Sequence, residues 1–195
     1  MRVGIIGPES TGKTSLARYL AKRYKGTYVP EYARAYVEQM DKGREARGEW
    51  TKVITYEDVC SIAKHQIEEM EAISRQPSAF SRQHSAFSIQ HSAISPKDGL
   101  TAKRSNNEVV FFDTELLVTK VWFEYAFGRV PEWLDEAIKR YPMDVYLLTY
   151  PDLPWIPDPA RSNGSDEIRL ELYHKYEAEI QDLGIPYYII RHSAD

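Results

Sequence analysis

Eight residues near the N-terminus have the types and spacing of a phosphate-binding loop. Residues 7–14 read G-P-E-S-T-G-K-T, which fits the pattern G-x-x-x-x-G-K-[ST], and they follow an apolar run at residues 3–6. In such a loop the glycines let backbone N–H groups curl around the β-phosphate, the lysine bridges the β- and γ-phosphates, and the last hydroxyl ligates Mg²⁺. The sequence therefore predicts that Lys13 and Thr14 bind ATP and its Mg²⁺ ion.

The rest of this loop completes the predicted nucleotide site. A helix that begins directly after the loop would add the positive end of its dipole to the phosphate site. The alternative, a glycine-rich turn that binds no ligand, would leave the preceding strand pattern and the following amphipathic helix as a coincidence. The predicted ATP-binding residues are Gly7, Glu9, Ser10, Thr11, Gly12, Lys13, Thr14 and Ser15.

Two acidic residues follow later strands and are the predicted partners of the loop. Residues 110–113 read V-F-F-D, an apolar strand with an acid at its carboxyl end, as in a Walker B strand whose aspartate holds a Mg²⁺ water. Asp113 would equally cap the helix expected after it, so a structural role stays open. Glu31 follows the strand expected at 27–29, and it would orient an acceptor hydroxyl or, alternatively, stabilise a helix dipole.

One arginine and three aromatic residues are candidates for contacts with the substrate. Arg34 lies one helical turn beyond Glu31, where it would reach phosphate or, alternatively, form a surface salt bridge. Aromatic side chains stack on planar rings, although they also commonly pack in a core or at its rim. The predicted substrate-binding residues are Glu31, Tyr32, Arg34, Asp113, Trp122 and Trp155.

The segment at residues 151–164 has the composition of a lid. It is too rich in proline for a helix and too long for a tight turn. An arginine carried by a closing lid would neutralise charge on the transferred phosphoryl group, whereas the alternative is a solvated side chain. The predicted lid residues are Asp158, Arg161 and Arg169, and Arg161 joins Lys13, Glu31 and Asp113 in the predicted catalytic set.

Strand and helix patterns alternate along the chain, and they must position these residues. Strands that alternate with helices form a parallel sheet covered on both faces. The sequence therefore predicts a three-layer α/β P-loop NTPase fold with a five-stranded, mainly parallel sheet. Strands are expected at 2–6, 27–29, 109–112, 145–148 and 187–190, and helices at 14–24, 31–40, from 56 onward, 116–127, 131–141 and 169–183.

Composition and charge favour a cytoplasmic protein with small-molecule partners. The 195 residues are 43% apolar, enough for one domain over residues 1–195 with a sizeable core and no disulfide. The single cysteine, Cys60, is expected to be a helix-core residue rather than a reactive thiol. A net charge of −4 without a basic run argues against a nucleic-acid partner, and no apolar stretch approaches the 18 residues of a membrane span.

A repeat of seven residues, present in three copies, interrupts the alternating pattern before the third strand. Residues 74–80, 81–87 and 88–94 are three copies of one seven-residue unit. A coiled coil is disfavoured because the apolar pair occupies adjacent positions and Pro77 interrupts the first copy. His84 and His91 recur without a carboxylate or cysteine, which favours a solvated loop over a metal site. We expect a low-complexity insert at 74–107.

The motifs, taken together, resemble the ribosylnicotinamide kinase domain of NadR-type NAD-biosynthesis proteins. Beyond the P-loop, the resemblance rests on P-E-Y-A-R at 30–34, A-K-H-Q at 63–66, F-D-T-E-L-L-V-T-K at 112–120 and P-D-P-A-R at 157–161. It implies a nucleoside-kinase-like fold and ATP- and Mg²⁺-dependent phosphorylation of nicotinamide riboside at its 5′-hydroxyl. It places Glu31 and Arg34 on the riboside side, Asp113 at the metal or acceptor edge and Arg161 in the lid.

Two departures from this family limit the predicted activities. Larger members carry a nucleotidyltransferase domain with an H-x-G-H motif, and some add a helix-turn-helix, but this sequence has neither. Adenylyltransferase and repressor activities are therefore not expected from these residues. Two other functions stay open: a P-loop ATPase or regulatory ATP-binding module without a riboside substrate, and a nucleotide-binding interaction protein without turnover.

Overall fold

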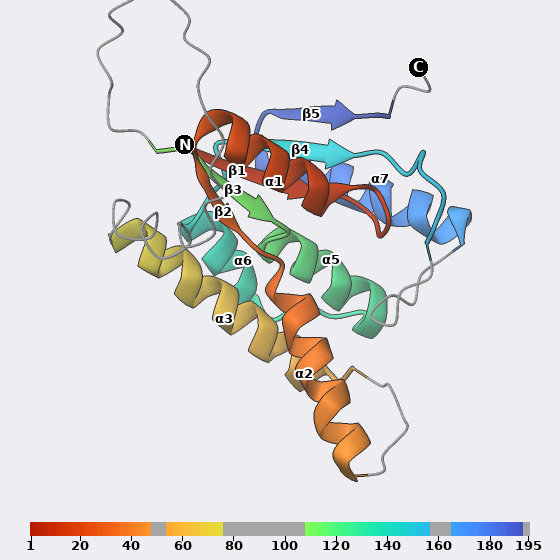
Figure 1. The fold of residues 1–195 in the computed structure, drawn as a ribbon. Coiled ribbons are helices and arrows are strands. Elements are labelled where there is room, and N and C mark those ends of the chain that lie inside the picture. The colour runs from red at the N-terminus through yellow and green to blue at the C-terminus, as the bar shows by residue number, and fades with distance from the viewer. Residues whose placement is uncertain (48–53, 76–107, 157–164, 193–195) are drawn as a thin grey trace, which may run out of the picture.

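A parallel sheet of five strands forms the centre of the fold (Figure 1). The computed structural model describes residues 1–47, 54–75, 108–156 and 165–192. The strands are β1 (Arg2–Ile6), β2 (Thr27–Val29), β3 (Val110–Asp113), β4 (Val145–Thr149) and β5 (Tyr187–Ile190). Their order is β2-β3-β1-β4-β5, and every neighbouring pair is parallel. The predicted three-layer α/β fold is confirmed.

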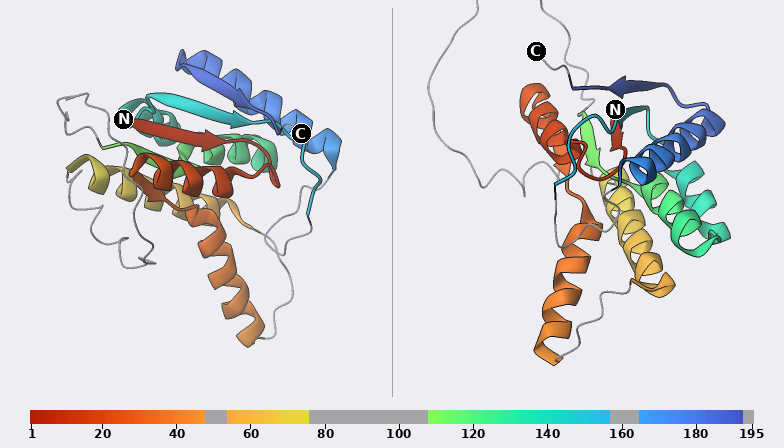
Figure 2. Two further views of the ribbon diagram at one scale, coloured as in Figure 1. Left: turned by 45° about the horizontal axis from the view of Figure 1, so that its top comes forward. Right: turned by 90° about the vertical axis from the view of Figure 1, so that its right-hand side faces the viewer.

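Helices cover both faces of this sheet (Figure 2). Helix α1 packs on one face through Ala17 and Ala21, against Val3, Ile5 and Phe111. The larger core lies on the other face, between the sheet and α3, α5, α6 and α7. The described helices are α1 (Lys13–Tyr24), α2 (Tyr32–Arg47), α3 (Tyr56–Arg75), α5 (Leu116–Phe127), α6 (Glu132–Arg140) and α7 (Asp166–Leu183).

The apolar composition of the central strands follows from burial on both faces. All four residues of β3 are buried, as are the last four residues of β1. Because parallel strands point the same way, the carboxyl ends of β2, β3 and β1 meet at one edge of the sheet, where α/β proteins bind ligands. The P-loop, Glu31 and Asp113 all follow or end these strands at that edge.

Several element boundaries differ from the sequence prediction, each for a local reason. Helix α7 begins at Asp166 instead of 169, because the Ser165 side chain accepts a hydrogen bond from the Ile168 amide and caps the helix. Helix α3 continues through Arg75, and the Ser74 hydroxyl accepts a bond from Arg2 at 2.6 Å. The first two residues of the expected insert therefore belong to α3. Residues 76–107, with His84 and His91, lie outside the described residues.

Two further sequence expectations concern Cys60 and the membrane. Cys60 lies half-buried in α3, and burial raises the pKa of its thiol, as suits a packed side chain rather than a nucleophile. Within the described ranges, no helix combines the length and apolar character that crossing a membrane requires.

Glu115, and not Asp113, caps helix α5. The Glu115 side chain accepts a hydrogen bond from the Leu117 amide at 3.0 Å, and its backbone is extended. The alternative role of Asp113 as the cap is therefore wrong, because the cap lies two residues further along. Glu115 is buried, and this burial raises the pKa of its carboxyl to about 7. Its cap position thus places a carboxyl group inside the core.

Glu115→Gln should flatten the dependence of stability on pH. Between pH 4.5 and about 7 the folded protein holds a proton on Glu115 that the unfolded chain has lost, so the free energy of unfolding falls as pH rises. The amide keeps the cap acceptor and removes this titration. The difference in free energy of unfolding between the variant and the wild type should therefore shift in favour of the variant by about 1 kcal/mol or more from pH 5 to pH 8. Urea unfolding at both pH values measures this shift.

A gain that is equal at both pH values would contradict the assignment of this titration to Glu115. Glu69 supplies a check, because burial also raises the pKa of its carboxyl to about 7. The Glu115→Gln protein should therefore keep a residual slope, which Glu69→Gln should remove.

Candidate active site

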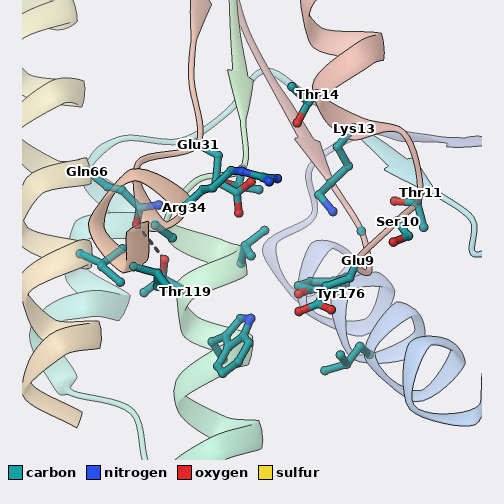
Figure 3. A pocket seen from close by; sticks show the side chains of 18 of the residues that line it. Glu9, Ser10, Thr11, Lys13, Thr14, Glu31, Arg34, Gln66, Thr119 and Tyr176 are labelled. Atoms are coloured by element: carbon teal, nitrogen blue, oxygen red, sulfur yellow. Dashed lines mark hydrogen bonds between the residues drawn. The ribbon is translucent and has the colours of Figure 1, made fainter. Parts of the chain in front are cut away.

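One cavity of about 240 Å³ joins the P-loop to the acceptor-side candidates. Figure 3 shows Glu31 and Arg34 on one side of it and Lys13 and Thr14 on the other. The cavity walls come from the P-loop, the start of α2, and α3, α5 and α7. The lining residues are Gly7, Glu9, Ser10, Thr11, Gly12, Lys13, Thr14, Ser15, Glu31, Ala33, Arg34, Val37, Ile54, Val59, Ile62, Gln66, Thr114, Val118, Thr119, Trp122, Leu172 and Tyr176.

The two P-loop glycines occupy positions that other residues would strain. Gly7 has φ 143°, and a Cβ there would collide with the Thr149 hydroxyl and lie 2.6 Å from the Thr149 carbonyl oxygen. Gly12 has φ 76° and caps α1 in the left-handed region. Ser10 also has a positive φ, 57°. These conformations turn the loop tightly at the end of β1.

Hydrogen bonds from buried hydroxyls hold the loop against β4. The Thr11 hydroxyl lies 2.8 Å from the Pro8 carbonyl oxygen and 2.6 Å from the Thr149 hydroxyl, and the latter contacts the Ile6 carbonyl oxygen. The Lys13 ammonium donates to the Pro8 carbonyl oxygen at 2.6 Å. Lys13 therefore lies across the loop, with its charge at the cavity wall.

Asp113 is the last residue of β3 and, unlike Thr114 beside it, is not among the residues that line the cavity. Its side chain has no exposed surface, and Oδ2 accepts a bond from the Tyr28 hydroxyl at 3.1 Å. Burial, followed by the Asp113 charge, raises the pKa of Tyr28 to about 12, so the phenol stays a donor. Oδ1 has no hydrogen-bond partner among the described residues, and Thr114, the next residue, lines the cavity.

The residues at this edge fit a Mg²⁺ ion. Mg²⁺ in nucleotide sites keeps several waters and takes only one or two protein oxygens, so a buried carboxylate with one unpaired oxygen suits a bound water of the ion. The Thr14 hydroxyl in the cavity wall is the second oxygen of this set. Within the described ranges no group of three or more His, Cys, Asp or Glu gathers to form an all-protein metal site.

Glu31 and Arg34 bring opposite charges to the far wall of the cavity. Arg34 lines the cavity, and its Nε also forms an ion pair with Glu38 Oε1 at 3.2 Å on the surface of α2. The surface ion pair of Arg34 is therefore present, and its contact with phosphate stays a prediction. Tyr176 lies near the carboxylates of Glu9 and Glu31, and its pKa is raised by burial first and by these two charges.

Only one of the three candidate aromatic residues lines the cavity. Trp122 of α5 lies in its wall. Tyr32 stacks instead on His65 of α3, with 3.6 Å between ring centroids, and faces a separate small cavity of about 10 Å³. Trp155 is absent from the lining, and its buried Nε1 has no hydrogen-bond partner among the described residues.

Gln66 and Thr119 form a polar pair in the cavity that sequence reasoning did not select. The Thr119 hydroxyl donates to Gln66 Oε1 at 2.8 Å, and both residues are buried (Figure 3). This bond orients the amide so that its NH₂ group is the end left to meet a ligand. The available signal was a glutamine on the otherwise apolar face of α3, beside Val59, Ile62 and Met70.

Arg169 lies in the helix where it was expected, but its side chain is buried and therefore does not serve a mobile lid. It belongs to α7, its side chain is 1% exposed, and it donates to the Glu9 and Leu153 carbonyl oxygens. These two bonds hold the guanidinium group against the backbone of the P-loop and of the segment after β4. Asp158 and Arg161 lie outside the described residues.

The chain is similar to known proteins both in sequence and in fold. A family model described as an AAA domain matches residues 2–195. The trifunctional NAD biosynthesis/regulator proteins NadR of Escherichia coli (strain K12) and Salmonella typhimurium (strain LT2) are each 26% identical to the chain, over 87% and 84% of it. The chain spans 33% and 31% of these relatives, about a third of their length.

Solved structures share the fold at lower sequence identity. The crystal structure of a NadR protein in complex with NR has a TM-score of 0.65 and 22% identity, covering 100% of this chain and 46% of that one. Thymidylate kinase from Ehrlichia chaffeensis has a TM-score of 0.55 and 12% identity, covering 100% and 88%. The P-loop, the strand order and the match over nearly all residues lead to one conclusion: the chain belongs to the AAA domain family.

Proposed function

We propose that this protein transfers the γ-phosphoryl group of ATP to the 5′-hydroxyl of nicotinamide riboside and releases nicotinamide mononucleotide. The observation that carries the proposal is the shared cavity, in which Glu31 and Arg34 face the P-loop residues Lys13 and Thr14 (Figure 3). A donor site and an acceptor site in one enclosure are what direct transfer requires. The similarity to NadR proteins supports the choice of acceptor.

The P-loop end of the cavity is assigned to ATP. Its backbone amides, together with the positive end of α1, stabilise the phosphates, and Lys13 leaves the Pro8 carbonyl to neutralise charge on the β- and γ-phosphates. Bound Mg²⁺ supplies further charge neutralisation, and Thr14 and Asp113 are the residues assigned to hold it. No covalent intermediate on the protein is part of this mechanism.

The opposite end is assigned to the riboside. Glu31 orients the primary hydroxyl and accepts its proton as the oxygen attacks the γ-phosphorus, and Arg34 stabilises the transferred group. Val37, Ile62 and Trp122 give the base an apolar wall, and the Gln66 amide meets its polar substituent. Arg161, in the predicted lid, is assigned to the transferred phosphoryl group.

A coupled kinase assay with a panel of nucleosides tests this function. Nicotinamide riboside should stimulate ADP formation and yield nicotinamide mononucleotide, identified by mass spectrometry. Phosphate release that needs no nucleoside would instead support the alternative of a P-loop ATPase or regulatory module. Tight ATP binding without turnover would support an interaction protein.

Lys13→Ala should reduce the turnover of the kinase by about 10²-fold or more, because it removes a charge that stabilises the transition state. The thermal unfolding temperature should change little, since Lys13 lies at the cavity wall and is only partly buried. Lys22→Ala is the matched control, because Lys22 is an exposed residue of the same helix. Near-normal turnover in Lys13→Ala would remove the P-loop from the mechanism.

Glu31→Gln and Asp113→Asn should separate the acceptor side from the metal side. Glu31→Gln should lower turnover by about 10²-fold with near-normal ATP·Mg²⁺ affinity, since only the hydroxyl contact is damaged. Asp113→Asn should raise the Mg²⁺ concentration needed for half-maximal rate. Titration of both variants with Mg²⁺ checks this, with Glu136→Gln on exposed α6 surface as the control. A shifted Mg²⁺ requirement in Glu31→Gln alone would reverse the two roles.

Thr119→Val should weaken the riboside site through Gln66. Loss of the hydroxyl removes the bond that orients the amide, so KM for nicotinamide riboside should rise roughly fivefold while KM for ATP stays the same. Ser61→Ala is the control, because it removes an exposed hydroxyl bond from α3, the helix that carries Gln66. A lower unfolding temperature with both KM values unchanged would reduce the Gln66–Thr119 pair to a packing role.

A further inference from the structure

A buried guanidinium group from α7 forms a hydrogen bond with the backbone of the P-loop. The Arg169 side chain is 1% exposed and donates from Nε to the Glu9 carbonyl oxygen at 3.2 Å. A second bond runs from a terminal nitrogen to the Leu153 carbonyl oxygen at 2.8 Å, and a third to Asp166 Oδ1 at 3.1 Å. Arg169 is not among the residues that line the cavity.

Helix stability does not explain why a cation occupies this position. Arg169 lies within about one turn of the positive end of α7, where a cation opposes the helix dipole. The carboxylate that pairs with it, Asp166, is 89% exposed, so solvent weakens this ion pair. A buried charge needs compensating contacts, and two of its three bonds go to backbone carbonyls of other segments.

The bond to Glu9 has a direct consequence for the nucleotide site. In a trans peptide the carbonyl oxygen and the next N–H point to opposite sides, and the structure has no cis peptide among its described residues. A hydrogen bond that holds the Glu9 oxygen toward Arg169 therefore directs the Ser10 amide away from it. Ser10 lines the cavity and has a positive φ of 57°. Arg169 thus orients one amide of the phosphate cradle.

The same guanidinium group ties the P-loop to the segment after β4. Leu153 accepts one of its bonds, and the Ile156 amide donates to the Ser10 hydroxyl at 3.3 Å. A Leu153 methyl carbon also lies 3.7 Å from the position of a Cβ at Gly12. The segment after β4 is therefore linked to the P-loop directly at Ser10 and, through Arg169, at Glu9.

We propose that Arg169 is a positioning residue, which holds the Glu9–Ser10 peptide in the orientation that binds the triphosphate. It acts through the loop backbone and touches no substrate itself. The inference rests on the proposed binding of ATP at the P-loop. The ligand whose binding Arg169 affects is the polyphosphate of ATP, and the riboside end of the cavity is not involved.

Arg169→Lys tests this role, because it keeps the charge and loses the planar fork that reaches two carbonyls. The dissociation constant of Mg²⁺·AMP-PNP, measured by calorimetry, should rise about tenfold or more, while that of nicotinamide riboside stays within about twofold. Asp166→Asn is the control, since it removes the ion pair and leaves the bonds to Glu9 and Leu153. The control should bind AMP-PNP like the wild type.

A lower unfolding temperature with unchanged AMP-PNP affinity in Arg169→Lys would overturn the proposal and leave a structural role. Failure of the wild type to bind AMP-PNP would overturn the proposed function instead. If the variant does not fold, NMR of the wild type decides, because the Arg169 Nε–H should exchange slowly with solvent and shift when AMP-PNP binds. A signal that the nucleotide does not shift would overturn the proposal.

Discussion

The parallel pairing of β1 with both β3 and β4 is the constraint on which the site depends. Each strand is hydrogen-bonded on both sides and buried on both faces, so its direction cannot change without loss of the core. Parallel strands place their carboxyl ends at one edge. The P-loop after β1, Asp113 in β3 and Glu31 beyond β2 therefore come together although they are far apart in the chain.

The P-loop depends on supports from two other elements. From β4, the Thr149 hydroxyl contacts Thr11 and leaves room only for glycine at position 7. From α7, the buried Arg169 holds the Glu9 carbonyl. A binding loop with several fixed contacts loses less conformational freedom when a ligand binds, so these buried polar contacts favour affinity as well as stability. The nucleotide site is thus a property of the whole sheet edge.

Three carboxyl groups near this edge differ because their surroundings differ. Asp113 accepts a hydrogen bond from the Tyr28 phenol through Oδ2, and its Oδ1 has no hydrogen-bond partner among the described residues. Glu31 lies in the cavity wall with Arg34. Glu115 is buried as a helix cap, and burial raises the pKa of its carboxyl. Environment, rather than residue type, separates the cap Glu115 from Asp113 and Glu31, whose proposed roles are metal binding and hydroxyl orientation. Within this segment a cap and a metal candidate are only two residues apart.

The sequence by itself determined the elements and the phosphate loop, because glycine positions, apolar periodicity and strand-end acids are local signals. Only the tertiary structure decided which side chains meet. It separated Asp113 from the cap role taken by Glu115, turned Tyr32 onto His65, and buried Arg169 behind the loop. It also placed Gln66 and Thr119 together in the cavity. These outcomes depend on contacts between distant segments, and such contacts are set by packing across the sheet, which no local pattern records.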